Sequence, residues 1–214
     1  MSHDLTLTYF DISAGRGEPI RMALYYGSIA FEDERLGIEE YLAKKNELPM
    51  GQVPVLTIRS TGKVISQSAA ILRYIGKIAG LYPEDPAAAL KCDMIMDTVN
   101  ETADLMRRIR HSPGQEQESK IDDQQIKALE DLVEDRLKPF FANIEGQLQA
   151  AGTNFFLGDQ VTICDLCTYE FIRILIQGTL DVSYDARTDF PTLASLYQGI
   201  ENESRLEPYF HSLV

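Results

Sequence analysis

The chain changes character at residues 81–86, where Leu81-Tyr82-Pro83-Glu84-Asp85-Pro86 contains two prolines and no hydrophobic period. Before this segment, short apolar runs separated by turn residues indicate both strands and helices. After it, almost the whole sequence has the spacing of helices. A chain of 214 residues is long enough for one large or two small domains. We therefore expect domains at residues 1–80 and 87–214, joined by a linker at residues 81–86.

The first eighty residues predict a βαβ unit followed by a ββα unit. Leu5, Leu7 and Tyr9 alternate with polar neighbours, as in a strand with two different faces. Glu18-Pro19 favours a helix start, because proline at the first helical position gives up no needed donor. We expect strands near residues 5–10, 29–36, 53–59 and 64–65, and helices near 18–26, 38–48 and 68–78. This order is that of an α/β domain with a thioredoxin-like fold.

The second half predicts an all-α helical bundle, with helices near residues 87–110, 121–150, 162–177 and 192–203 and a break at Ser112-Pro113-Gly114. Thr162 and Asp165 have the spacing of a capping box, in which a hydroxyl and a carboxylate satisfy free helix N–H groups. Cys164-x-x-Cys167 is compatible with redox or metal chemistry, but it falls inside a helical pattern and has no second cysteine pair. We interpret both cysteines as small helix residues and expect no metal.

Charge excludes several classes of partner. The formal net charge of −13 repels phosphate backbones and anionic lipid headgroups, so we expect neither nucleic acid nor membrane as a partner. No apolar run approaches the roughly 18 residues of a membrane helix, and the first residues lack the pattern of a secretory signal. We expect a cytoplasmic protein, whose three cysteines are reduced.

Four motifs occur in order in the first domain: Tyr9-Phe10-Asp11, Arg16-Gly17-Glu18-Pro19-Ile20-Arg21, Leu48-Pro49-Met50-Gly51-Gln52-Val53-Pro54-Val55-Leu56, and Gln67-Ser68-Ala69-Ala70-Ile71-Leu72-Arg73-Tyr74-Ile75. Each motif alone is weak, but four in register resemble the cytosolic glutathione transferases. The tyrosine-type classes are the most similar. Among them the chain looks most like the sigma class, which includes prostaglandin D synthases and S-crystallins. The resemblance is strong over the first 80 residues and looser beyond.

The resemblance implies a transferase that adds the thiolate of its co-substrate glutathione to small apolar electrophiles. It places glutathione on residues Tyr9, Arg16, Tyr41, Lys45, Gln52, Val53, Pro54, Gln67, Ser68 and Glu101. It implies a cis bond before Pro54, and a helix start at Gln67-Ser68 whose free N–H groups suit a carboxylate. Tyr41 replaces the tryptophan usual in relatives. The electrophile pocket is expected at Phe10, Ile12, Met106, Arg107 and Arg110.

Three questions stay open at this level. Tyr9 is the expected catalytic residue, but the loop after it is one residue longer than usual and also contains Ser13, the type of residue that serine-type classes use. A glutathione-dependent isomerase of the prostaglandin D synthase type is an alternative, as is a non-catalytic crystallin-like or scaffold protein. The resemblance also implies a homodimer in which an acid of the first long helix reaches the partner's glutathione. Asp97, Glu101 and Asp104 share one helix face, and Glu101 aligns best.

Overall fold

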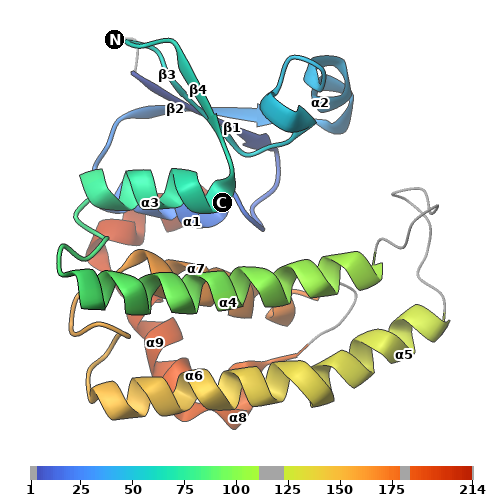
Figure 1. Ribbon diagram of the computed structural model, residues 1–214, viewed down its shortest axis with the longest axis vertical. Coiled ribbons are helices and arrows are strands. Elements are labelled where there is room, and N and C mark those ends of the chain that lie inside the picture. The colour runs from blue at the N-terminus through green and yellow to red at the C-terminus, as the bar shows by residue number, and fades with distance from the viewer. Residues whose placement is uncertain (1–3, 111–122, 179–183, 214) are drawn as a thin grey trace. The chain divides into compact units, whose positions relative to one another are not determined.

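The structure is a computed structural model that describes residues 4–110, 123–178 and 184–213. The chain forms two compact units. The N-terminal unit combines Met1–Glu84 with Asn202–Val214, and the helical unit is Asp85–Glu201. Figure 1 shows the elements of each unit.

The N-terminal unit is built on a four-stranded mixed sheet in the order β2-β1-β3-β4. The strands are β1 (Leu5–Phe10), β2 (Phe31–Leu36), β3 (Val55–Ile58) and β4 (Lys63–Ser66). β1 is parallel to β2 and antiparallel to β3, and β3 is antiparallel to β4. The buried side chains of Leu7 and Leu56 explain why β1 and β3 are the inner strands. The mixed sheet confirms the predicted fold class.

Helices α1 (Glu18–Tyr26) and α3 (Ser68–Ile78) lie side by side along the sheet, and α2 (Ile38–Lys44) follows β2 (Figure 1). A 3₁₀ turn, η1 (Pro49–Gly51), precedes β3. The helix expected at residues 38–48 is shorter than predicted. Leu48 has the extended conformation that a residue before proline prefers, with φ −77° and ψ 141°, so the helix cannot continue to it.

The C-terminal residues pack on the N-terminal unit, although the sequence pattern placed them in a helical domain reaching residue 214. The segment contains η3 (Ser204–Leu206) and α10 (Glu207–His211). Leu206 and Tyr209 are fully buried, and the Tyr209 hydroxyl donates to Glu18 of α1 over 2.6 Å. The burial of these side chains and the hydrogen bond to Glu18, which local spacing cannot reveal, hold this segment on the N-terminal unit.

Among its described residues, the helical unit contains one helix more than predicted and divides another into segments. Its elements are α4 (Pro86–Arg110), α5 (Asp123–Leu132), the π-helical turn η2 (Val133–Leu137), α6 (Lys138–Ala151), α7 (Ile163–Ile176), α8 (Ala186–Asp189) and α9 (Pro191–Glu201). The helix expected at 121–150 is thus α5, η2 and α6 in succession. The break expected at residues 112–114 lies outside the described residues. Within the described ranges, no helix has an apolar stretch long enough to cross a membrane.

Helix α7 is the core of the helical unit, with twelve of its fourteen residues buried. Its first turn has the predicted capping box: the Thr162 amide donates to the Asp165 carboxylate over 2.8 Å. The same carboxylate accepts the Phe156 amide at 3.0 Å. Burial raises the pKa of Asp165 to about 6, and these hydrogen bonds oppose the rise. Asp165 therefore ties the preceding loop to the helix start.

We expect Asp165→Ala to lower the free energy of unfolding by about 3 to 5 kcal/mol, because two buried N–H groups lose their acceptor. Asp185→Ala is the matched control, since Asp185 caps the short α8 at a more exposed position and accepts the Arg187 amide. Its loss should be about 1 kcal/mol. Urea unfolding at pH 7.5 measures both values. Equal losses of unfolding free energy in the two variants would show that burial does not increase the stability contributed by the Asp165 cap.

Candidate functional site

The sheet register brings three chain segments to one end of the sheet. Thr8 pairs with Val55, and Val55 pairs with Ser66. Tyr9 at the end of β1, Val53 just before β3 and Gln67 just after β4 therefore lie at the same sheet end. Strand ends open on loops, and functional side chains concentrate there because the sheet holds them rigidly. The motifs that carried the resemblance thus converge on one place in the N-terminal unit.

Tyr9 is held in a tight space and is only 7% exposed. A Cβ atom at Gly17 would lie 2.3 Å from a carbon of the Tyr9 ring, and one at Gly15 would lie 2.9 Å from its hydroxyl oxygen. Only glycine permits such an approach at Gly17, where the backbone runs against the ring. The loop before α1 therefore fixes the direction of the phenol.

The phenolic oxygen of Tyr9 accepts a hydrogen bond from the Arg16 amide over 3.2 Å. The guanidinium carbon of Arg21 lies 5.6 Å from the centroid of the Tyr9 ring, within range of a cation–π contact. The amide occupies an acceptor position of the oxygen, so it does not compete with donation of the phenolic proton. A donor of this kind becomes stronger when its oxygen is itself hydrogen-bonded. Arg16 thus supports Tyr9 through its main chain.

The start of α3 offers free amide groups at the same sheet end. The first intrahelical bond runs from the Ile71 amide to the Gln67 carbonyl, so the amides of the first turn have no helical acceptor. Gln67 has φ 76°, a conformation that costs about 1 to 3 kcal/mol and concentrates at binding sites. In the described part of the chain its side chain does not cap the helix but donates to the Met50 sulfur. The positive helix end is suited to a carboxylate.

The Val53–Pro54 bond is cis, as the resemblance implied. Val53 lies beyond the last β1–β3 pair, Thr8–Val55, at the sheet end. A peptide strand laid there could pair with the main chain. Gln52, the residue before Val53, is exposed.

Tyr41 is anchored beside this segment. Its hydroxyl donates to the Gly51 carbonyl over 2.8 Å, and its ring lies 4.9 Å from that of Phe10 in an edge-on contact. The Lys45 ammonium lies 6.0 Å from the Tyr41 ring centroid. Tyr41, which stands where relatives usually have tryptophan, therefore contacts both the turn before Val53 and the Phe10 ring. Of the two loop residues expected in the electrophile pocket, Phe10 packs against the Tyr41 ring, whereas the side chain of Ile12 is 46% exposed.

Ser13 lies half-buried in the loop between β1 and α1. Sequence reasoning missed the supports of Tyr9, namely Gly15, Gly17 and Arg21. The signal was present, since Gly17 and Arg21 belong to the second motif, but only the folded loop shows that both contact one ring.

The remaining expected residues lie on α4 in the helical unit. Met106 is fully buried, and Arg107 is exposed and pairs with Asp104. The side chain of Arg110 is outside what the structure describes. The electrophile pocket therefore stays a prediction.

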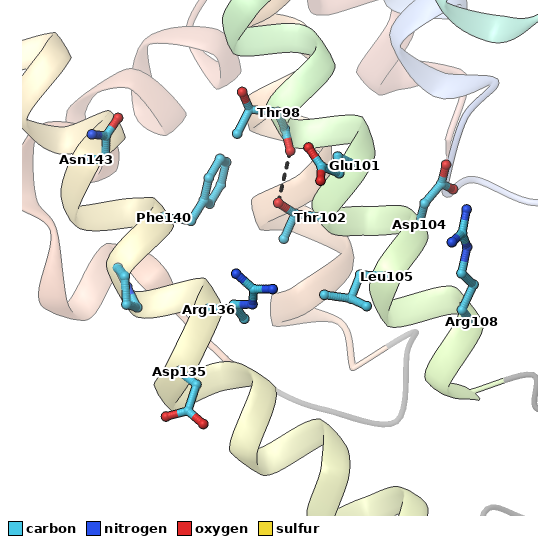
Figure 2. Close-up of a pocket in the computed structure, with 11 residues that line it drawn as sticks. Thr98, Glu101, Thr102, Asp104, Leu105, Arg108, Asp135, Arg136, Phe140 and Asn143 are labelled. Carbon is cyan, nitrogen blue, oxygen red and sulfur yellow. Dashed lines mark hydrogen bonds between the residues drawn. The ribbon is translucent and has the colours of Figure 1, made fainter.

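Glu101 lines a cavity of about 810 Å³ between α4 and the helix formed by η2 and α6. Figure 2 shows Thr102 and Leu105 of α4 across from Arg136 and Phe140. Asp104 also lines the cavity, whereas Asp97 does not. Among the described residues, no cation pairs with Glu101. Glu101 therefore shares this cavity with Asp104 and with Arg136.

Fold and site together define a two-domain protein whose thioredoxin-like half presents a tyrosine, a cis-proline turn and a helix start at one sheet end. Family models match both halves: "Glutathione S-transferase, N-terminal domain" over residues 5–77 and "Glutathione S-transferase, C-terminal domain" over residues 103–213. The chain belongs to the glutathione S-transferase family. It is a transferase, and glutathione is the family's substrate.

Individual relatives agree with this assignment. Glutathione S-transferase 2 of Caenorhabditis elegans is 32% identical over 79% of this chain and 87% of its own length. The structure of prostaglandin synthase D of Nilaparvata lugens is 27% identical with a TM-score of 0.81, covering 97% of this chain and 96% of that one. Monomeric Na-GST-3 of Necator americanus is 26% identical with a TM-score of 0.80, covering 98% and 97%. The predicted likeness to the sigma class is confirmed.

We expect Gly17→Ala to lower turnover at least about tenfold, because the new methyl group displaces the Tyr9 ring and small misplacements of a reacting group are costly. Gly17 has φ −78°, so alanine suits the backbone itself and the fold should persist. Gly146→Ala is the control, since nothing lies within 4 Å of its added Cβ. Steady-state conjugation and circular dichroism measure both variants. Full activity of Gly17→Ala would show that the ring has freedom the structure does not indicate.

Proposed function

We propose that Tyr9 is the catalytic residue and donates its phenolic proton to the sulfur of glutathione. The observation that carries this proposal is the hydrogen bond from the Arg16 amide to the Tyr9 oxygen, which aligns the phenol without using its proton. The site residues around it belong to one sheet end. The γ-glutamyl carboxylate is assigned to the start of α3 at Gln67 and Ser68, and the cysteinyl main chain to Val53. Gln52 and Lys45 are assigned to the glycyl end.

One phenol nearly suffices to ionise the thiol near neutral pH. Lowering a thiol pKa from about 8.5 by two units requires about 2.7 kcal/mol, which is within the range of a hydrogen bond to a charged group. The thiolate fraction at pH 7 then rises from about 3% to about 76%, but the weaker base loses about six- to tenfold in nucleophilicity. Ionisation alone gains only a few fold. Most of the acceleration must come from holding the sulfur and the electrophile in line.

The electrophile class that we propose is small, apolar and reactive toward thiolates. A second candidate function is a glutathione-dependent isomerase, in which the thiolate attacks and is later released. The likeness to the prostaglandin synthase D structure favours this candidate. Incubation with aryl halides, hydroperoxides and endoperoxides separates the two, since only conjugation consumes glutathione into an adduct. Cytoplasmic location stays a prediction.

We propose a homodimer in which Glu101 reaches the γ-glutamyl ammonium held by the partner. Its exposure and its lack of a cation among the described residues support this role. Leu90 and Met94, one turn apart on α4, are 72% and 49% exposed, and Tyr74 and Ile78 are similarly spaced on α3. Exposed apolar pairs of this kind favour burial in an interface.

Tyr9→Phe should keep glutathione affinity within a few fold, lower turnover at pH 6.5 at least about tenfold and move the pH–rate profile upward, because the sulfur loses its donor. Ser13→Ala is the matched comparison and should cost less than about fivefold. Initial rates between pH 5.5 and 9, with isothermal titration of glutathione, measure these effects. The opposite pattern, activity lost with Ser13→Ala and kept with Tyr9→Phe, would make this a serine-type enzyme.

Glu101→Gln should weaken glutathione binding about tenfold or more, because the charge-assisted contact across the dimer is lost. Asp97→Asn and Asp104→Asn on the same helix face should change binding less than about twofold. Titration calorimetry measures affinity, and sedimentation should show that all three variants remain dimers. If sedimentation shows that the wild-type protein is a monomer and this monomer binds glutathione at full affinity, both the dimer and the shared site are contradicted.

A further inference from the structure

Arg21 is a fully buried cation at the base of the candidate site. Its Nε donates to both carboxylate oxygens of Asp33 on β2, at 3.0 and 3.1 Å. Its Nη1 donates to the Ile12 carbonyl over 3.2 Å and to Glu18. A charge removed from water is retained only where partners of this kind compensate it. Arg21 therefore joins β2, α1 and the loop that follows Tyr9.

The guanidinium of Arg21 lies over the ring of Tyr9. The guanidinium carbon lies 5.6 Å from the ring centroid. Among the described residues, the buried Nη2 of Arg21 has no hydrogen-bond acceptor. An aromatic face attracts a cation and can accept an N–H group weakly. This contact restrains the ring on one face, and Gly17 limits its movement at another point.

Glu18 extends this network to the end of the chain. One carboxylate oxygen accepts from Arg21, and the other accepts the Tyr209 hydroxyl over 2.6 Å. Glu18 and Tyr209 are both fully buried, and the Tyr25 ring packs on that of Tyr209 at 5.9 Å. Tyr209 belongs to α10, which forms part of the N-terminal unit. A residue 191 positions from Glu18 thus completes the surroundings of Arg21.

We propose that Arg21 is a positioning residue for Tyr9, and that Tyr209 holds Arg21 in place through Glu18. The C-terminal helix α10 then determines how accurately the phenol meets the sulfur. This inference rests on the proposed role of Tyr9. It assigns a catalytic consequence to a hydroxyl that touches neither substrate.

The test is Tyr209→Phe, which removes one hydroxyl and keeps the ring that packs on Tyr25. Glutathione is bound by other residues, so its KM should change less than about twofold, while kcat falls about three- to tenfold as the phenol loses its alignment. Tyr26→Phe is the matched control. Tyr26 lies on α1 and, like Tyr209, joins α1 to the C-terminal segment, but its partner is Arg205 and not Glu18. Removal of the Tyr26 hydroxyl should therefore leave kcat unchanged.

A double-mutant cycle separates positioning from a general structural effect. In the Tyr9→Phe background there is no phenol to misplace, so adding Tyr209→Phe should change kcat less than about 1.5-fold. An equal fall of kcat in both backgrounds would overturn the proposal, as would an unchanged kcat in the Tyr209→Phe single variant. If Tyr9→Phe itself leaves turnover intact, the proposed function of Tyr9 fails, and that result is read from the single variant alone.

Asp33→Asn provides a second approach if Tyr209→Phe does not fold. Asp33 is one-quarter exposed and keeps one acceptor oxygen as asparagine, so the fold tolerates the change better. The substitution removes the negative charge of Asp33 and so weakens the interaction between β2 and Arg21. Its kcat loss should also disappear in the Tyr9→Phe background, and a loss that persists there would overturn the role of Arg21.

Discussion

The guanidinium of Arg21 is fully buried, and the N-terminal unit is arranged so that this charge is compensated. Asp33 comes from β2, Glu18 from the first turn of α1 and the Ile12 carbonyl from the loop between β1 and α1. Removing any one partner would leave a buried charge underbalanced, which is among the most costly defects in a protein interior. This one side chain therefore ties the loop after β1, helix α1 and strand β2 together. The same side chain lies against Tyr9.

The candidate site follows from the sheet that this network secures. Because β1 is parallel to β2 and antiparallel to β3, the end of β1 meets the start of β3 and the end of β4. The Tyr9 phenol, the cis-proline turn at Val53–Pro54 and the start of α3 thus come together from segments that are far apart in sequence. Strand β1 holds the tyrosine, and segments outside the strands supply the turn and the helix start. This division suits an enzyme that must bind a tripeptide along its main chain and align one thiol.

The helical unit makes a different contribution. Asp165 secures α7 with buried hydrogen bonds, so its role is in folding. Cys164 and Cys167 are buried in the same helix, in agreement with their interpretation as helix residues. Glu101 lies on an outer face of α4, beside a cavity next to the π-helical turn η2. Such turns are frequent near functional sites, because they offset the side chains that follow. The unit thus combines the buried helix α7 with a cavity that is lined by charged side chains.

The sequence by itself determined the order of strands and helices, the change at residues 81–86, the capping box and the family, because these depend on local spacing and on motifs that stay contiguous. It also placed Tyr9 near the end of a strand, and the resemblance to the family made this residue the expected catalytic one. Only the tertiary structure decided that residues 202–214 join the N-terminal unit, because burial of Leu206 and Tyr209 against α1 has no local signature. It likewise decided what surrounds Tyr9. Nothing in the sequence alone sets apart Gly17, Arg21 and Tyr209. Their importance arises from tertiary contacts that form only when the chain folds.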